Sequence, residues 1–241
     1  MLDWLKRDPR AAPCIEVAGQ RLPVIVRRLG HARRMTLRLA PGGGEVRVSM
    51  PQWARTADAL AFARSRTDWL ESQLAALPVQ TPLIAGGTLP YRGSLFTIAH
   101  DERAPRHVVL AEGKVHVGGP TASFPGRLRR WLEKEAQALC SEDLAYYCAR
   151  AGKAPPRLAL SNAQRRWGSC APDGAIRINW RLAMAPDFVR RSVVAHEVAH
   201  LVHFDHSPRF HALLTELYEC DIAEANRWLK AKGRTLYAPF G

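Results

Sequence analysis

Two histidines and a glutamate stand close together in the segment His196-Glu197-Val198-Ala199-His200. Residues four apart lie on one face of an α-helix, so the two imidazoles can reach a single metal ion. Glu197 is one step round the helix from His196, where a carboxylate can take a proton from an activated water without binding the metal. A shuffled chain of this composition would contain this pattern with a chance of only about 0.02. The spacing therefore predicts a hydrolytic metal centre.

A catalytic zinc ion usually has three protein ligands and one open position, so a third donor is required. His206 is favoured because it stands just before Ser207-Pro208, at the corner where the helix should end and the chain can turn back. The same spacing fits the metzincin pattern HExxHxxGxxH, although His203 occupies the place of its turn glycine. A glutamate from the next helix, Glu216 or Glu219, is the gluzincin-like alternative. Cys170 as a fourth ligand would close the site and make the metal structural.

The elements that position these residues follow from hydrophobic spacing. In the first half, apolar and polar residues alternate as they do in strands, except in one helical stretch. The second half has mainly helical spacing, with two short strands before the histidine motif. We therefore predict an α+β fold with two parts, a β-rich region over 1–124 that contains one long helix and a helical domain on a small sheet over 125–241. The predicted strands are 15–17, 22–26, 35–39, 46–48, 95–99, 108–117 with a break at Glu112-Gly113, 157–160 and 176–180. The predicted helices are 56–77, 127–150, 187–203, 207–218 and 221–232.

Composition narrows the class of protein. The chain has 241 residues, of which 47% are hydrophobic and 24% are charged, values typical of a folded globular protein. The net charge of +13 would attract nucleic acid, but the basic residues are mostly arginine and spread along the chain, as compositional drift would also give. Five scattered cysteines, no long apolar segment and a charged start predict a cytoplasmic protein without disulfides or contact with a membrane.

Several further motifs make a family resemblance specific. The histidine segment continues into Leu201 and is followed by His206-Ser207-Pro208-Arg209-Phe210. It is preceded by Arg166-Trp167-Gly168-Ser169-Cys170 and by Ile178-Asn179-Trp180-Arg181-Leu182. Together these motifs resemble the YgjP-like metallopeptidase domain, which is related to SprT-type zinc proteases, and the similarity extends from about residue 33 onward. His211 stands where members of the family commonly have a tryptophan, a departure that affects the pocket wall and leaves the ligand set unchanged.

The resemblance implies a zincin-like C-terminal domain with one zinc ion per chain. In this interpretation His196, His200 and His206 bind the zinc and Glu197 is the general base for hydrolysis of a peptide bond. An extended peptide can add to a sheet edge beside the metal helix, and the strand 176–180 is predicted to be that edge or its neighbour. Arg166, Ser169 and His211 are candidates for contacts with the substrate or the oxyanion. A packed Trp167 with Arg166 in a structural ion pair is an equally good interpretation of that motif.

Two other functions remain open at this point. A metal-dependent hydrolase of nucleotide phosphoanhydrides could use the same centre with arginines on the phosphates, although the sequence has no glycine-rich phosphate loop. Alternatively, the basic surface could recruit an SprT-like protease to nucleic acid, where it would cleave bound proteins. The natural substrate, endo- or exopeptidase action, the identity of the metal in the cell and the oligomeric state are not encoded in these patterns.

Overall fold

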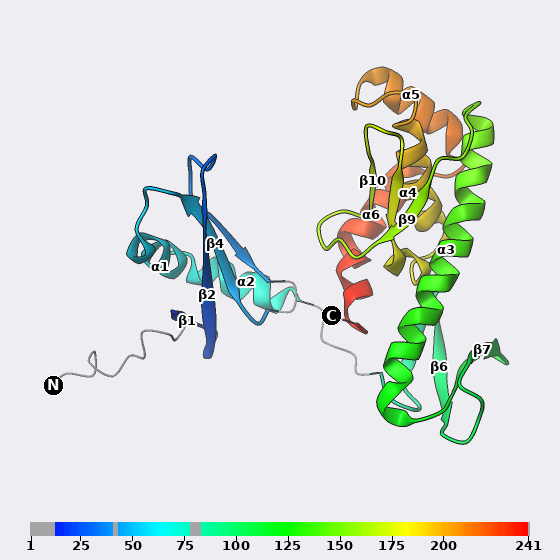
Figure 1. Ribbon diagram of the computed structural model, residues 1–241, viewed down its shortest axis with the longest axis horizontal. Helices are drawn as coiled ribbons and strands as arrows, with labels where there is room; N and C mark the ends of the chain where they lie inside the picture. The colour runs from blue at the N-terminus through cyan, green and yellow to red at the C-terminus, as the bar shows by residue number, and fades with distance from the viewer. Residues whose placement is uncertain (1–12, 41–42, 78–82, 241) are drawn as a thin grey trace. The chain divides into compact units, whose positions relative to one another are not determined.

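A computed structural model of the protein describes residues 13–40, 43–77 and 83–240. The chain forms two compact units that divide between Leu77 and Pro78 (Figure 1). Both units combine helices with strands, so the α+β fold class predicted from the sequence is confirmed. The domain boundary predicted between residues 124 and 125 lies inside the second unit, at the start of a helix, and that division stays a prediction.

In residues 13–40 and 43–77 the first unit forms a four-stranded sheet with two helices on one face. The strands lie in the order β1-β2-β4-β3, with β2 and β4 parallel and the other pairs antiparallel. Alternate strand residues such as Val24, Val46 and Val48 are buried with Ala59 and Leu70 of the helices. The elements are β1 (Cys14–Val17), β2 (Gln20–Leu29), β3 (Thr36–Leu39), β4 (Val46–Pro51), α1 (Thr56–Arg64) and α2 (Thr67–Ala75).

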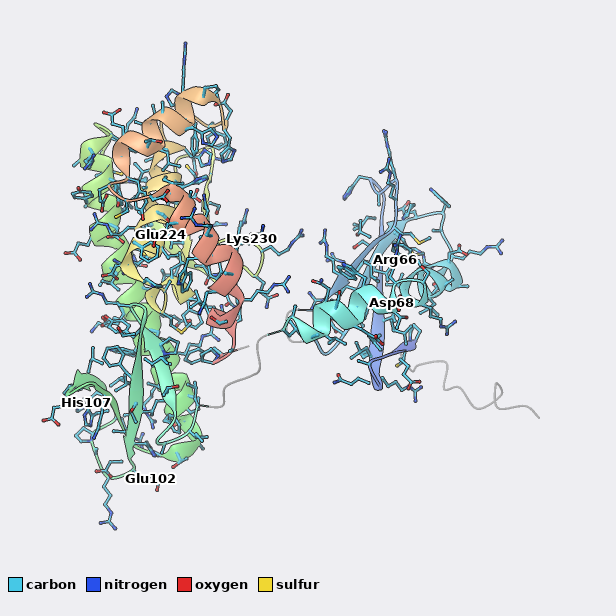
Figure 2. The ribbon with its side chains drawn as sticks, turned by 180° about the vertical axis from the view of Figure 1, so that it is seen from behind. Arg66, Asp68, Glu102, His107, Glu224 and Lys230 are labelled. Atoms are coloured by element: carbon cyan, nitrogen blue, oxygen red, sulfur yellow. The ribbon has the colours of Figure 1, made fainter. Side chains whose placement is uncertain are left out.

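The single long helix predicted over 56–77 is wrong, because the structure has two helices there. The Ser65 hydroxyl donates a hydrogen bond to the Phe62 carbonyl, and the Thr67 hydroxyl donates to the Arg64 carbonyl. These side chains satisfy carbonyl groups that a continuous helix would bond through its backbone, so the helix ends and restarts. Arg66 and Asp68 mark the junction in Figure 2.

Over residues 83–240 the second unit forms two sheets and four α-helices. Its elements are β5 (Thr88–Tyr91), β6 (Ser94–Asp101), β7 (Val108–Ala111), β8 (Lys114–Gly118), α3 (Phe124–Arg150), β9 (Leu158–Ser161), β10 (Gly168–Cys170), β11 (Ile176–Asn179), α4 (Asp187–Ala199), α5 (Pro208–Leu217) and α6 (Ile222–Lys232), with 3-10 turns at Thr121–Ser123, Trp180–Ala183 and Gly233–Tyr237. The sheets have the orders β5-β6-β8-β7 and β10-β11-β9. Of the helices in the described ranges, none combines the length and the apolar character needed to cross a membrane.

Helix α3 connects the two sheets of the second unit into one core. It runs past both sheets and beside α4 (Figure 1). Its buried side chains repeat mainly every four residues, as in Leu128, Leu132, Ala136 and Cys140, and therefore form one stripe along the helix. The helix that carries the histidine motif packs against this stripe.

A hairpin holds the start of α4. The turn between β5 and β6 places Arg92 and Gly93 at positive φ, and their N–H groups donate to the carbonyls of Ala183 and Met184. Arg92 also forms an ion pair with Asp187, the first residue of α4. Strand β5 is absent from the sequence prediction because Pro90 interrupts its apolar pattern and the strand is defined only by its pairing with β6.

The three-stranded sheet lies next to α4. Strand β11 is in the centre, parallel to β9 and antiparallel to β10. The strand 176–180 was predicted to be the edge of the sheet or the neighbour of the edge. The structure confirms that it is the neighbour, because β10 is the edge strand. β10 was absent from the prediction. Helix α4 ends at Ala199 with His200 as its C-cap, four residues before the predicted end.

A buried ion pair joins α3 to α4 and yields a first prediction. Arg190 is 3% exposed, its Nε donates to the Asp143 carboxylate at 2.7 Å, and its Nη1 donates to Asp187 at 2.5 Å. Removing one partner of a buried pair costs about 3–5 kcal/mol, because the remaining charge stays in a poorly solvated place. Since Asp187 still contacts Arg190, Asp143→Ala is expected to lower the free energy of unfolding by about 3 kcal/mol. Urea unfolding followed by circular dichroism measures this loss.

A matched control is the exposed pair of Arg129 and Glu133, which joins neighbouring turns of α3 at 2.9 Å. Glu133→Ala is expected to lower the free energy of unfolding by less than about 1 kcal/mol, because solvent screens both charges. An equal loss in the two variants would mean that burial does not decide the strength of the Arg190 pair.

Candidate metal centre

Three imidazoles converge at the end of α4. His196 lies in the last turn of α4, His200 is the C-cap residue of this helix, and His206 comes from the loop before α5. The Nε2 atoms of His196 and His206 are 3.2 Å apart, and the three ring centroids are 4.7–5.2 Å from one another. One nitrogen from each ring lies within 4.8 Å of the other two. The structure therefore brings His206, the third donor predicted from the sequence, next to His196 and His200.

The donor set fits a small divalent cation. With metal–nitrogen distances of about 2.0–2.1 Å, a tetrahedral site separates its ligand nitrogens by about 3.3 Å, close to the spacing of His196 and His206. The Nδ1 atom of His200 lies 3.2 Å from the His203 carbonyl. Because a carbonyl only accepts hydrogen bonds, Nδ1 carries the proton and Nε2 is free to bind a metal.

The protonation of the histidines also suits a metal. Burial, with smaller contributions from the neighbouring histidines, lowers the pKa of His196 to about 4. The pKa of His200 is lowered as well, mainly by burial. Both imidazoles are therefore neutral at neutral pH, and the neutral form is the one that binds metals.

Phe210 forms the wall behind the triad. Its ring, fully buried on α5, lies 4.6–4.9 Å from the ring centroids of His196, His200 and His206. The ring restricts the histidine rotamers and excludes water from that side. The sequence prediction assigned no role to Phe210, although its position four residues after His206, on the first turn of α5, is a signal that could have found it.

Glu197 lies beside the triad against strand β10. Its side chain is buried, at 5% exposure, and its carboxylate accepts a hydrogen bond from the backbone N–H of Cys170. Burial raises the pKa of Glu197 to about 7, although this hydrogen bond and the charge of Arg166 both act to lower it. A carboxyl group with a pKa near neutrality can both accept and return a proton at physiological pH.

The family model of the YgjP-like metallopeptidase domain matches residues 33–232, most of the chain. The chain belongs to this family. No curated protein and no solved structure gives a match. Membership of this metallopeptidase family makes the protein a peptidase, a hydrolase that acts on peptides or proteins with the help of a metal cofactor.

The other donors considered for this YgjP-like domain lie outside the histidine cluster. Glu219 accepts a hydrogen bond from the Tyr147 hydroxyl at 2.9 Å and pairs with Arg191. His203 contacts His200 through its backbone carbonyl. The Cys170 thiol contacts the Ala171 carbonyl at 3.6 Å. Among the described residues, the group that can hold a metal consists of His196, His200 and His206.

The three substrate-contact candidates lie in different places. Arg166 is exposed, and its charge acts on Glu197. Ser169 lies between two β10 residues that face Glu197, and strand alternation directs it to the opposite face of β10. His211 is exposed, with its ring centroid 6.3 Å from that of His206. The geometry thus brings Arg166 and His211 towards the centre and directs Ser169 away from Glu197.

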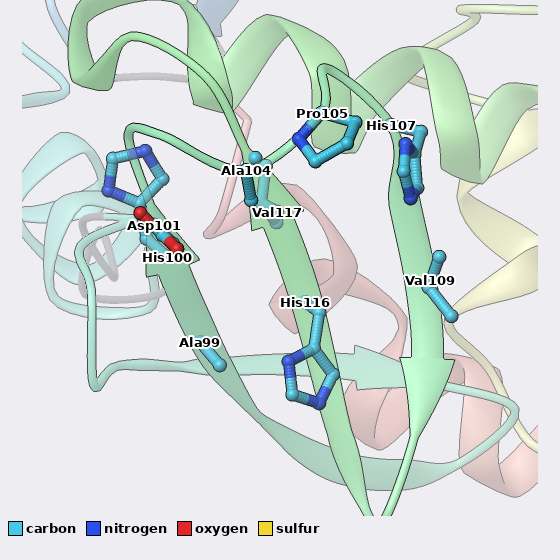
Figure 3. Close-up of a pocket in the computed structure, with 10 residues that line it drawn as sticks. Ala99, His100, Asp101, Ala104, Pro105, His107, Val109, His116 and Val117 are labelled. Atoms are coloured by element: carbon cyan, nitrogen blue, oxygen red, sulfur yellow. The ribbon is translucent and has the colours of Figure 1, made fainter.

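Another group of histidines lies in a pocket of about 210 Å³ on the β5-β6-β8-β7 sheet. His100, His107 and His116 line it from β6, a loop and β8, but their rings are spread around the pocket (Figure 3). The His100 Nε2 lies 2.7 Å from the Gly119 carbonyl. Since these imidazoles do not converge, they form no second metal-binding group among the described residues.

Gly168 is a site residue that the sequence prediction quoted without a role. A Cβ atom added there would lie 2.7 Å from Cγ and 2.8 Å from Cδ of Glu197, and closer still to Oε1. Real Cβ atoms essentially never come within 3.0 Å of such atoms. The glycine therefore provides the space in which the carboxylate lies.

Proposed function

We propose that this YgjP-like domain is a zinc-dependent peptidase with a zincin-like site, in which Glu197 is the general base. One observation carries the proposal: three imidazole donors converge beside a buried carboxylate that is held against an edge strand. Three histidine ligands with a further position for solvent or substrate are characteristic of catalytic zinc. Imidazoles also accept cobalt, nickel or iron, so metal analysis has to identify the ion.

His196, His200 and His206 would hold the ion. When bound, the ion supplies Lewis-acid chemistry: it polarises the scissile carbonyl group and makes water a better nucleophile. The Glu197 carboxylate takes a proton from the attacking water and then delivers it to the nitrogen of the leaving amine. Burial of Glu197 excludes competing solvent, and the Cys170 N–H orients the carboxylate.

The presence of the edge strand β10 favours a peptide as the substrate over a nucleotide. The Cys170 N–H on the outer edge of β10 already donates to Glu197, and the main-chain groups that remain on that edge can pair with an extended peptide next to α4. In this proposal Arg166 contacts the carbonyl oxygen on which charge develops or an acidic group of the substrate, and His211 contacts a substrate side chain. Ser169 is the weakest of the three candidates because it faces away from Glu197.

The test combines metal analysis of the purified chain with a cleavage profile on an unbiased peptide library. We expect one zinc per chain and cleavage that a chelator abolishes and zinc restores. Casein and a nucleoside triphosphate are compared with the same metal-loaded sample. Hydrolysis of the triphosphate without cleavage of any peptide would overturn the peptidase assignment in favour of a phosphoanhydride hydrolase.

A second prediction tests the ligand set. His206→Ala is expected to weaken zinc binding by more than about a hundredfold, because losing a ligand costs more than losing a group that only orients one. Competition with a chromophoric chelator measures this change. His203→Ala and His211→Ala are matched controls from the same segment and should bind zinc like the unmodified chain. If His203→Ala lost zinc and His206→Ala kept it, His203 would be the third ligand in place of His206.

A further inference from the structure

One end of the sheet in the first unit gathers residues from two connections. Strands β2 and β4 are parallel and end together, with Leu29 opposite Pro51. Because β4 lies between β2 and β3, the loop 30–35 crosses the end of β4. The Gln52 side chain lies beside Gly30, and the Arg28 Nη2 donates a hydrogen bond to the Thr56 hydroxyl at 2.8 Å. The β2–β3 loop and the turn after β4 therefore form one surface.

This surface is basic and carries an exposed indole. Arg28 near the end of β2 and Arg33 and Arg34 in the loop 30–35 lie at this end, and that loop contains no acidic residue. Trp53, in the turn after β4, is 80% exposed, while Ala54 beside it is buried and anchors the turn. We call this group the arginine–tryptophan surface, and all of its members are exposed: Arg28, His31, Arg33, Arg34, Trp53 and Arg55.

An indole that contributes so little to the core indicates a binding role. Among the residues of the first unit that the structure describes, Trp53 joins no buried cluster, so folding does not explain its exposed position. Tryptophan and arginine are the residue types that most often dominate binding energy at interfaces. Because arginine and tryptophan occur together on this surface, we expect a partner that has both anionic groups and a flat aromatic face.

We propose that the arginine–tryptophan surface binds single-stranded nucleic acid. The guanidinium groups contact phosphates, and the Trp53 ring stacks on an unpaired base. A duplex offers the same phosphates but keeps its bases stacked on one another, so single strands are preferred. An acidic peptide or an anionic membrane would satisfy the arginines but provides no base for the indole. The proposal concerns the first unit and does not depend on peptidase activity in the second.

The experiment measures fluorescence anisotropy of labelled oligothymidylate and oligouridylate, each of about twenty nucleotides, and a duplex of that length, with the full chain. Trp53→Ala is expected to raise the dissociation constant for the single strands roughly tenfold or more, and Trp53→Phe to restore most of the affinity. The double variant Arg33→Glu/Arg34→Glu should reduce the slope of log affinity against log salt by about 1.4, since each phosphate contact contributes about 0.7. Circular dichroism and thermal unfolding show that each variant is folded.

The matched control is Arg64→Glu/Arg66→Glu, which makes the same change in charge at the junction of α1 and α2. It should change the affinity and the salt slope much less than the Arg33/Arg34 variant does. Three results would overturn the proposal: no binding of either oligonucleotide at about 50 mM salt, equal weakening by the two double variants, or wild-type affinity in Trp53→Ala. Tighter binding to the duplex, to polyglutamate or to phosphatidylserine vesicles than to the single strands would overturn the choice of partner.

Discussion

Glu197→Gln is expected to slow peptide cleavage by roughly 10²–10⁴-fold while the chain keeps its metal. The amide has almost the same size as the carboxylate, so it should occupy the same space beside Gly168 and still accept a hydrogen bond from the Cys170 N–H. An amide, however, takes no proton from water at neutral pH. The loss should therefore appear in kcat, with bound zinc and thermal stability close to those of the unmodified chain.

The matched control for this variant is Glu224→Gln, the same isosteric change at an exposed position on α6 (Figure 2). It should leave cleavage and metal content unchanged. If Glu197→Gln cleaved peptides at the rate of the control, the proton would have to be taken by another group, and the general-base assignment would fail. If Glu197→Gln lost its zinc, Glu197 would instead belong to the ligand set.

The local part of the centre could be predicted from the sequence because helical spacing is a local property. His196 and His200 share a face in any helix of that length, and Ser207-Pro208 predicts where the next helix begins. These two signals were enough to select His206 as the third candidate, and the structure places it beside His196. The hydrogen bond from His200 to the His203 carbonyl was not predictable, because it depends on how the chain turns after Ala199.

The parts that were missed depend on contacts between distant segments. Strand β10 has only three residues and no alternation of its own, and it is a strand because it pairs with β11. The contact of Gly168 with Glu197 requires that pairing together with the packing of α4 on β10. The break between α1 and α2 was missed for a different reason: Ser65 and Thr67 are compatible with a helix by spacing, and their hydroxyls end it through individual hydrogen bonds.

Gly168→Ala is expected to lower kcat about a hundredfold with little change in KM or in metal content. The added Cβ would lie 2.7 Å from Cγ of Glu197, so one of the two residues has to move. The backbone of β10 is held by its pairing with β11 and by the hydrogen bond from the Asn179 N–H to the Trp167 carbonyl at 2.7 Å. The carboxylate moves instead, and a displacement of about 1 Å at a reacting group can cost about a hundredfold in rate.

A double-variant comparison separates positioning of Glu197 from general damage to the fold. If Gly168 acts through the carboxylate, Gly168→Ala should slow the Glu197→Asp enzyme less than the unmodified one, because the shorter side chain leaves room for the new methyl group. Gly126→Ala at the start of α3 is the control, since the nearest atom to its added Cβ, in the flexible Arg130 side chain, is 3.7 Å away. If Gly168→Ala slowed the unmodified enzyme and the Glu197→Asp enzyme equally, Gly168 would be needed for the structure of β10 and not for the position of the Glu197 carboxylate.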